Sequence, residues 1–300
     1  MTEWKTYRLG DIAEVQTGPF GSQLHNKDYA LVGSPIVTVE HLGNRHFTTQ
    51  NLPLVSDTDK ARLSKYILSE GDIVFSRVGS VDRCSYVSDK EIGWLFSGRC
   101  LRVRCNREVY PLYIYYYFCL ESVKQYIRNV AVGATMPSIN TQIMSEIPIS
   151  LPSLEEQRRI AGILGAIDDK IENNRRINTN LELQAQALYK QWFVDNRSDN
   201  WEEKPLSEIA EFVGGYSYKG NELVESSSTA MATIKNFERK GGFKVDGFKG
   251  IVASPKLKAE QHTELFDILV AHTDLTQNAD VIGNAEILLT FGGYTDVIFS

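Results

Sequence analysis

The chain has 300 residues, of which 42% are apolar and 10% aromatic, enough to bury the cores of two ordinary domains. This composition excludes an intrinsically disordered protein. Acidic residues number 38 and basic residues 32, so the formal charge is −6 and the whole chain is not a uniformly basic nucleic-acid binder.

The sequence has neither a membrane helix nor a signal segment, which bears on the cellular compartment of the protein. The longest apolar run, residues 110–120, is shorter than the roughly 20 residues that a membrane helix needs, and the N-terminus has no apolar signal core. The cysteines form no CxxC pair; they are Cys84, Cys100, Cys105 and Cys119. We therefore expect a soluble, cytoplasmic protein whose thiols are free and buried.

Two parts of the sequence resemble each other. Residues 9–18 (LGDIAEVQTG) align with residues 206–215 (LSEIAEFVGG). Further pairs follow in the same order, namely 36–42 with 231–237, 72–75 with 267–270, and 94–97 with 297–300. Short amphipathic segments also recur by chance, but the preserved order favours a true repeat. The repeat predicts that Ser300 corresponds to Ser97 and that a counterpart of residues 98–196 is missing, through natural shortening or an incomplete chain.

Strands and helices alternate irregularly in the first part of the chain. Runs rich in β-branched and aromatic residues predict strands at residues 35–39, 72–76, 94–97, 100–104 and 147–151. Apolar residues between 111 and 130 recur with a helical period, and a loop follows them. These patterns predict an α+β fold.

A long helix begins near Ser153, which forms a capping box with Glu156. Its apolar residues recur in steps of four and three, which is the heptad pattern of a coiled coil. The heptad positions are Ile160, Leu164, Ile167, Ile171, Asn174, Asn178, Leu181, Ala185, Leu188 and Trp192. At 1.5 Å per residue, these 33 residues make a rod of about 50 Å. The two asparagines either fix the register of a partner helix or simply face solvent; a partner of similar length must come from the missing half or from another molecule.

Motifs of common enzymes are absent from the sequence. It has no nucleotide-phosphate loop, no zinc spacing and no nucleophile elbow, and its five histidines are scattered. Asp168 and Asp169, followed by Lys170, are expected on a solvated helix face. The sequence therefore predicts no catalytic residue and no metal site.

Charge is distributed unevenly along the chain. The net charge is +1 for residues 1–150, −1 for residues 151–195 and −6 for residues 196–300. The first part is thus the better candidate for contact with a polyanion, through the arginines Arg77, Arg83, Arg99, Arg102, Arg104 and Arg107. Alternating arginines on a strand can equally form a solvated face.

Residues 133–196 resemble the specificity (S) subunits of type I restriction-modification systems. The motifs that carry this resemblance are GATMPSIN, IPISLPSLEEQRRI, IDDKIENNRRIN and ALYKQWFVDN; LGDIAEVQTGPFGS and GDIVFSR near the start support it. The resemblance covers essentially the whole chain. It implies a first target recognition domain at 1–152, a conserved coiled-coil spacer helix at 153–196, and an incomplete second recognition domain at 197–300.

In that family each recognition domain reads one half of a split DNA target, and the helices set the gap. The resemblance therefore implies a non-catalytic subunit that binds double-stranded DNA and scaffolds methyltransferase (M) and restriction (R) subunits. S-adenosylmethionine is expected on the methyltransferase subunit, ATP and Mg on the restriction subunit, and no cofactor on this chain. Alternatives are a shortened subunit that dimerises through the heptad helix, a coiled-coil assembly protein without DNA reading, and an enzyme in its own right.

Three glycine-containing loops are the candidates for DNA contact. Their residues are Gly18, Phe20, Gly21, Ser22, Ser76, Arg77, Gly133, Thr135, Ser138 and Asn140. Arg77 suits guanine, Asn140 suits adenine, and Thr135 and Ser138 suit phosphate or base edges. The simpler interpretation is that these loops are glycine-rich turns.

Overall fold

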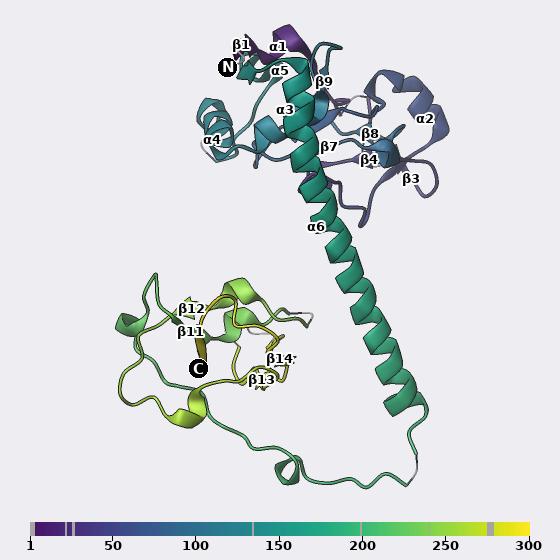
Figure 1. Cartoon of the computed structure of the whole chain (residues 1–300). Coiled ribbons are helices and arrows are strands. Elements are labelled where there is room, and N and C mark those ends of the chain that lie inside the picture. The colour runs from purple at the N-terminus through teal and green to yellow at the C-terminus, as the bar shows by residue number, and fades with distance from the viewer. Residues whose placement is uncertain are drawn as a thin grey trace. The chain divides into compact units, whose positions relative to one another are not determined.

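The structure is a computed structural model that describes residues 4–21, 23–25, 28–133, 135–198, 200–239, 241–274 and 279–300. The chain divides into two compact units, Met1–Asn196 and Arg197–Ser300, and each is described by itself. Both units combine helical segments with β-sheets (Figure 1), which confirms the α+β fold expected from the sequence.

An antiparallel sheet of order β2-β9-β6-β7 lies at the centre of the first unit. Its strands are β2 (Ala13–Thr17), β6 (Ile73–Ser76), β7 (Cys84–Tyr86) and β9 (Cys100–Cys105). All of β6 is buried, because the sheet is covered on both faces. Ile73 and Phe75 point into one core and Val74 into the other, as the alternation of side chains along a strand requires.

Helices cover the face of this sheet that carries Ile73 and Phe75. They are α1 (Leu9–Ile12), α3 (Pro111–Cys119), α4 (Glu121–Val130) and α5 (Thr141–Ser145). Phe118 of α3 packs edge-on against Phe75, with ring centroids 4.7 Å apart. A small antiparallel sheet of β1 (Lys5–Arg8) and β10 (Pro148–Leu151) joins the same core.

The helical region predicted between residues 111 and 130 is divided at Leu120. This residue has an extended backbone, with φ −63° and ψ 130°, and its side chain is half exposed. It ends α3 and precedes α4. The break allows Phe118 and Ile127, both fully buried, to enter the same core from two different helices.

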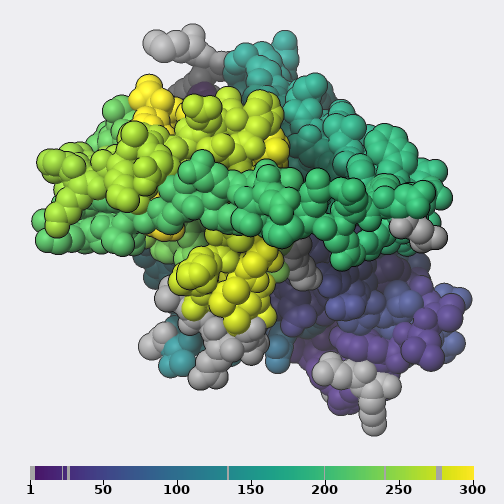
Figure 2. Space-filling view, turned by 90° about the horizontal axis from the view of Figure 1, so that it is seen from below, coloured from purple at the N-terminus to yellow at the C-terminus, as the bar shows by residue number. Residues whose placement is uncertain are grey.

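A second sheet of order β3-β5-β4-β8 packs on the opposite face of the central sheet. Its strands are β3 (Tyr29–Ala30), β4 (Ser34–Val37), β5 (Leu54–Val55) and β8 (Leu95–Phe96), and α2 (Asp57–Arg62) follows β5. The strands β4 and β8 pair in parallel. Purple and blue mark this lobe on the molecular surface (Figure 2).

The long helix α6 (Leu154–Tyr189) begins where the sequence predicts. The Ser153 hydroxyl accepts a hydrogen bond from the Glu156 backbone N–H at 3.3 Å, which caps the helix. The helix continues as a π-helical segment, Lys190–Asp195. In the described part of the chain, no helix combines the length and the hydrophobicity that crossing a membrane requires.

Short 3₁₀ turns join the elements of both units. They lie at Val39–His41, Ser64–Tyr66, Asp89–Glu91, Leu206–Glu208, Gly220–Glu222, Ile234–Asn236, Val245–Gly247 and Ala259–Gln261. Two of them correspond in the repeat. The Thr38 N–H donates to His41 Nδ1 at 3.2 Å, and the Thr233 N–H donates to Asn236 Oδ1 at 2.9 Å.

The second unit repeats part of the first unit's topology. Its strands are β11 (Thr229–Ala232), β12 (Lys249–Gly250), β13 (Ile268–Val270), β14 (Ala285–Ile287) and β15 (Asp296–Phe299). They form sheets of order β12-β11-β15 and β13-β14. β11 and β15 pair in parallel like β4 and β8, and β13 and β14 pair antiparallel like β6 and β7.

Backbone contacts follow the same correspondence. The Ser97 N–H donates to the Val37 carbonyl at 2.8 Å, and the Ser300 N–H donates to the Ala232 carbonyl at 3.1 Å. The first repeated segment differs, because residues 209–215 form no strand in the described chain. In the first unit the corresponding segment is β2, which pairs with β9.

The four cysteines are free, but they are not all buried. Cys84 and Cys100 are buried and Cys105 is half-buried, whereas Cys119 is exposed at the end of α3. The expectation of uniformly buried thiols is therefore wrong for Cys119. Burial raises the pKa of Cys100 and of Cys105 to about 12.

Candidate nucleic-acid interface

The central sheet brings three loops of the first unit to one end. Thr17 at the end of β2 lies opposite Leu101, and Ser76 at the end of β6 lies opposite Cys100. Because neighbouring strands are antiparallel, the residues after β2 and β6 and those before β9 leave the sheet at the same edge. These are the segments 18–21, 77–83 and 97–99.

Close backbone approach joins the segments 18–21 and 97–99. A Cβ atom on Gly18 would lie 2.1 Å from the Ser97 carbonyl oxygen, and one on Gly98 would lie 2.3 Å from the Pro19 carbonyl oxygen. Neither position has room for a side chain. The glycine at position 18, predicted as part of a DNA-contacting loop, thus has a packing role that its sequence context did not reveal.

The loop 133–140 joins the same end. Val78 and Ser138 form an isolated β-bridge, the Gly79 N–H donates to the Pro137 carbonyl at 2.8 Å, and the Ile139 N–H donates to the Arg77 carbonyl at 3.0 Å. The segments 18–21, 77–83 and 133–140, which belong to the three loops that the sequence singled out, therefore lie at the same end of the sheet. Together with residues 97–99 they are called the loop cluster below.

Arg77 connects these loops and is only partly exposed. Its Nη1 donates to the Gly98 carbonyl at 3.3 Å, and its guanidinium carbon lies 5.3 Å from the centre of the Phe20 ring. This is a cation–π distance. Its Nε is buried without a hydrogen-bond partner among the described residues. Arg77 thus supports Phe20, whose side chain is 51% exposed.

The other predicted residues have different surroundings. Ser76 is 2% exposed and its hydroxyl donates to the Val78 carbonyl at 2.7 Å, so its predicted contact with DNA is wrong and it closes the turn instead. The Ser138 hydroxyl donates to the Val132 carbonyl at 3.1 Å. Gly21 and Thr135 are exposed, and Ser22 lies outside the described residues.

Asn140 has a structural contact of its own. Its side chain is exposed, and its Oδ1 accepts a hydrogen bond from the Ile143 N–H at 2.8 Å, which caps α5. A bidentate contact with adenine uses both Oδ1 and Nδ2. The cap therefore competes with the predicted reading of adenine by this residue. Gly133, which precedes Asn140 in the same loop, has a φ of +109°.

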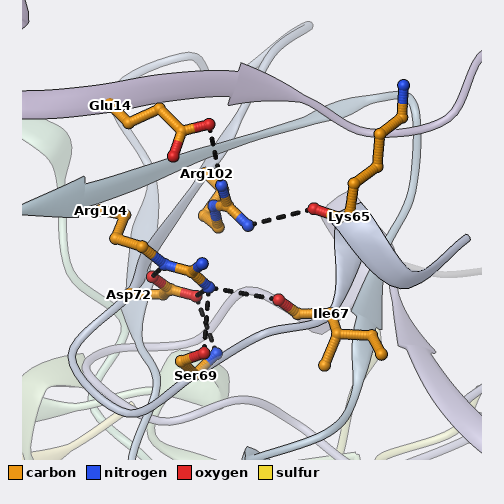
Figure 3. Close-up of polar contacts among 7 residues, drawn as sticks. All are labelled: Glu14, Lys65, Ile67, Ser69, Asp72, Arg102 and Arg104. Carbon is orange, nitrogen blue, oxygen red and sulfur yellow. Dashed lines mark hydrogen bonds and ion pairs between the residues drawn. The ribbon is translucent and has the colours of Figure 1, made fainter.

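Two of the arginines predicted to contact a polyanion form ion pairs with acidic residues of the first unit (Figure 3). Arg102 has a 3% exposed side chain, pairs with Glu14 at 3.2 Å and donates to the Lys65 carbonyl at 3.3 Å. Arg104 binds both carboxylate oxygens of Asp72, through Nε at 2.7 Å and Nη2 at 2.6 Å. The buried guanidinium of Arg102 is not accessible to DNA, which contradicts its prediction as a contact, whereas the Arg104 side chain is 37% exposed and its contact with DNA stays a prediction.

Three of the six arginines predicted to contact a polyanion are exposed, namely Arg83, Arg99 and Arg107. Arg83 and Arg99 flank the loop cluster: the Arg83 carbonyl accepts from the Ser76 N–H, and the Arg99 carbonyl accepts from the Arg77 N–H at 2.8 Å. Arg107 lies beyond the other end of β9. The nearby Asp82 carboxylate is paired with Arg128, so its negative charge is offset. The loop cluster therefore combines cationic side chains with exposed polar and aromatic groups.

The heptad residues of α6 fall into two groups. Ile160 is half-buried and packs against the core of the first unit, so part of its side chain is used by the domain itself. The following apolar heptad residues are 37–58% exposed: Leu164, Ile167, Ile171, Leu181, Leu188 and Trp192. Asn174, Asn178 and Ala185 are exposed as well. Most of the predicted seam is thus available on the surface of the first unit.

Acidic, histidine and cysteine side chains are the usual ligands of metal ions in proteins. Within the described ranges, no group of three or more could hold a metal ion.

The family model of the type I restriction modification DNA specificity domain matches residues 1–183. The chain belongs to this family. The match covers the central sheet, the loop cluster and most of α6.

Two relatives of this chain are specificity subunits of type I restriction enzymes. The chain is 28% identical over 195 residues to the type I restriction enzyme MjaIX specificity subunit of Methanocaldococcus jannaschii, covering 64% of this chain and 44% of that protein. It is 27% identical over 199 residues to the HindI specificity subunit of Haemophilus influenzae, covering 65% of this chain and 42% of that protein. The chain thus spans less than half the length of these specificity subunits.

A solved structure has the same fold. The S subunit of a type I restriction-modification system from M. genitalium superposes with a TM-score of 0.62 at 18% identity, over 98% of this chain and 71% of that one. The similarity extends through both units of this specificity-domain protein.

Proposed function

We propose that this chain is a non-catalytic DNA-recognition subunit of a type I restriction-modification system, whose first unit reads one half of a split target. The observation that carries the proposal is the convergence of the segments 18–21, 77–83 and 133–140 at one end of the sheet. This cluster lies inside the region that the DNA specificity domain model matches.

The side chains of the cluster suit DNA in distinct ways. Arg83 and Arg99 are exposed and can bind phosphates or the edge of a guanine. Thr135 offers a hydroxyl to a phosphate or a base edge, and the exposed ring of Phe20 offers an apolar contact to a base. Arg77 is proposed to determine specificity by holding Phe20 in place.

The exposed part of α6 is proposed to bind the other subunits. Its apolar seam from Leu164 to Trp192 suits a second helix, supplied by a second copy of this chain or by another S fragment. The methyltransferase and restriction subunits dock on the same scaffold in this proposal. S-adenosylmethionine then belongs to the methyltransferase subunit, and ATP and Mg to the restriction subunit, in the cytoplasm.

DNA binding by the full chain tests the first part of the proposal. In a filter-binding assay with random duplex at low salt, we expect binding that is lost as salt rises, because phosphate contacts release counterions. Arg83→Ala and Arg99→Ala should weaken the binding of DNA. Arg107→Ala should not, because Arg107 is exposed beyond the other end of β9. Absence of binding at low salt would favour a coiled-coil assembly protein without DNA reading.

Recognition of a target requires a second experiment. The chain is expressed with its methyltransferase subunit, and methylated positions are mapped across a genome. A bipartite motif with two different halves indicates a second recognition domain of different preference, and a palindrome indicates pairing of like copies. Random methylation or none would contradict the proposal.

A further inference from the structure

We infer that Arg45, Tyr116, Asp168 and Asp169 form a clasp that fixes the direction in which α6 leaves the first unit. The clasp is defined by contacts from two separate elements to one turn of the helix. Figure 1 shows α6 running past α3 and then extending away from the globular part of its unit. The consequence drawn below for target spacing rests on the proposed function, whereas the clasp itself does not.

Arg45 forms the first half of the clasp. Its Nη1 donates to the Gly165 carbonyl at 3.2 Å and to Asp169 Oδ1 at 2.7 Å. The Arg45 side chain is 14% exposed, although its partner Asp169 is 67% exposed. Because Arg45 binds both a backbone carbonyl and a carboxylate of α6, the contact constrains the orientation of the helix.

The loop that carries Arg45 is held by hydrogen bonds to β7. Arg45 has a left-handed backbone with φ +63°, and its carbonyl accepts from the Tyr86 N–H of β7 at 2.8 Å. The Ser85 hydroxyl donates to the Gly43 carbonyl at 3.0 Å and accepts from the Gly43 N–H at 2.9 Å. Arg45 is thereby tied to the same sheet whose other strands carry the loop cluster.

Tyr116 of α3 forms the second half. Its hydroxyl donates to Asp168 Oδ2 at 2.8 Å, and burial raises its pKa, which keeps the donor protonated. Small residues let the two helices approach, because Ala161 is fully buried and a Cβ on Gly165 would lie 3.4 Å from Leu112 Cδ2. The two aspartates expected on a solvated face thus bind the globular part of the unit.

Because of the position of the clasp along α6, a small tilt of the helix there would displace its far end. It is the last set of contacts before residues 170–189, which are exposed apart from a half-buried position at Asn173. Those 20 residues span about 30 Å at 1.5 Å each, so a tilt of about 10° at the clasp moves the far end by about 5 Å. At 3.4 Å per base pair along each strand, that displacement is between one and two base pairs. The clasp is therefore placed to control the distance between the loop cluster and anything bound to the far end of α6.

Spin-label distances test the clasp in the full chain. Cysteines replace the exposed residues Lys90 and Gln186 in a Cys119→Ser background, and the distance distribution is measured by electron paramagnetic resonance. Arg45→Gln combined with Tyr116→Phe should broaden or shift the distribution by about 5 Å, the displacement expected for the helix end. Glu172→Gln is the matched control, since it removes an ion pair to Arg175 on the same helix beyond the clasp. An unchanged distribution in the clasp variant would overturn the inference.

A second, more conservative variant tests the clasp even if the double variant does not fold. Asp169→Asn keeps the size of the side chain at an exposed position and should give a smaller broadening in the same direction. Circular dichroism confirms that each variant is folded before its distances are compared. If this folded variant and Tyr116→Phe both keep the parent distribution, the clasp does not fix the helix.

Target spacing gives the functional readout. With its methyltransferase subunit, the clasp variant should methylate the same half-target sequences while accepting gaps one base pair longer or shorter. Unchanged gap length would contradict the role of the clasp in spacing, and so would a changed half-target sequence. Failure of the proposed function is distinguishable, because the unaltered chain would then direct no sequence-specific methylation at all.

Discussion

Ile73 and Ile268 occupy the same position in the two units, yet Ile73 is fully buried and Ile268 is 67% exposed. Each opens the first strand of an antiparallel pair, β6 with β7 and β13 with β14. The same hydrogen bond precedes each strand: Asp72 Oδ2 accepts from the Ser69 N–H, and Asp267 Oδ2 accepts from the Glu264 N–H, both at 2.8 Å. The backbone arrangement is thus repeated, whereas no described part of the second unit covers Ile268 in the way that the helical layer covers Ile73.

This difference predicts unequal effects of one substitution. Ile73→Ala should lower the free energy of unfolding of the first unit by about 2–5 kcal/mol, because it leaves a cavity in a packed core. Ile268→Ala should change stability by less than about 0.5 kcal/mol, as is usual for exposed positions. Urea unfolding of the full chain, followed by circular dichroism, measures both. Equal effects would mean that the second unit buries Ile268 in solution.

The sequence predicts this repeat well because short strands keep their apolar pattern. The central strands and the start of α6 were also predictable, from periodicity and from the Ser153 cap. The break at Leu120 was not, since its residues continue the helical period and tertiary packing decides their direction. Likewise the heptad pattern cannot show that Ile160 is used by the domain itself.

The candidate site was predictable only in outline. Glycines marked the loops that converge, but a run of arginines does not reveal which of them meet acids distant in sequence. Arg102 and Arg104 are two residues apart on β9 and therefore point to the same side of the sheet. There they meet Glu14 and Asp72, which lie on or beside other strands. Arg45 gave no signal at all, because its partner Asp169 is far from it in sequence.

The ion pair of Arg104 and Asp72 should be essential for stability. The Asp72 side chain is 1% exposed, so Arg104→Ala leaves a buried carboxylate without its cation. We expect a loss of about 3–5 kcal/mol in the free energy of unfolding. Arg159→Ala, which breaks the exposed pair with Glu156 on α6, is the control and should change stability little. Thermal and urea unfolding measure the difference, and a stable Arg104→Ala variant would contradict the structural role.

Alanine substitutions at Gly18 and Gly21 should have different effects on stability, because only Gly18 is closely packed. Gly18→Ala places a methyl group 2.1 Å from the Ser97 carbonyl oxygen, so the two loops must move apart. We expect about 1–3 kcal/mol of destabilisation and weaker DNA binding. Gly21→Ala meets no atom within 4 Å and should be neutral for stability. Urea unfolding and filter binding test both variants, and a fully stable Gly18→Ala would show that this contact yields easily.

Alkaline pH should destabilise the first unit. Burial raises the pKa of Tyr113 from 10 to about 12, and its hydroxyl donates to the Ser150 carbonyl at 2.9 Å. Burial also raises the pKa of Cys100 from 9 to about 12. In the unfolded chain these groups ionise at their ordinary values, so stability that is present below pH 9 is lost as the pH rises to 12. Urea midpoints between pH 8 and pH 11 should fall, and they should fall less steeply for Tyr113→Phe; a constant midpoint in the parent chain would contradict this.

Arg77 and Arg99 should affect DNA binding in different ways. Arg77 supports Phe20 and bonds Gly98 inside the loop cluster, so Arg77→Ala should relax sequence preference at one or a few target positions. Arg99 is exposed, and Arg99→Ala should weaken binding to all sequences equally and reduce the salt-dependence slope by about 1. Selection from a random duplex library at two salt concentrations measures both effects, with Arg107→Ala as the control. An unchanged motif for Arg77→Ala would remove this residue from the reading of the target.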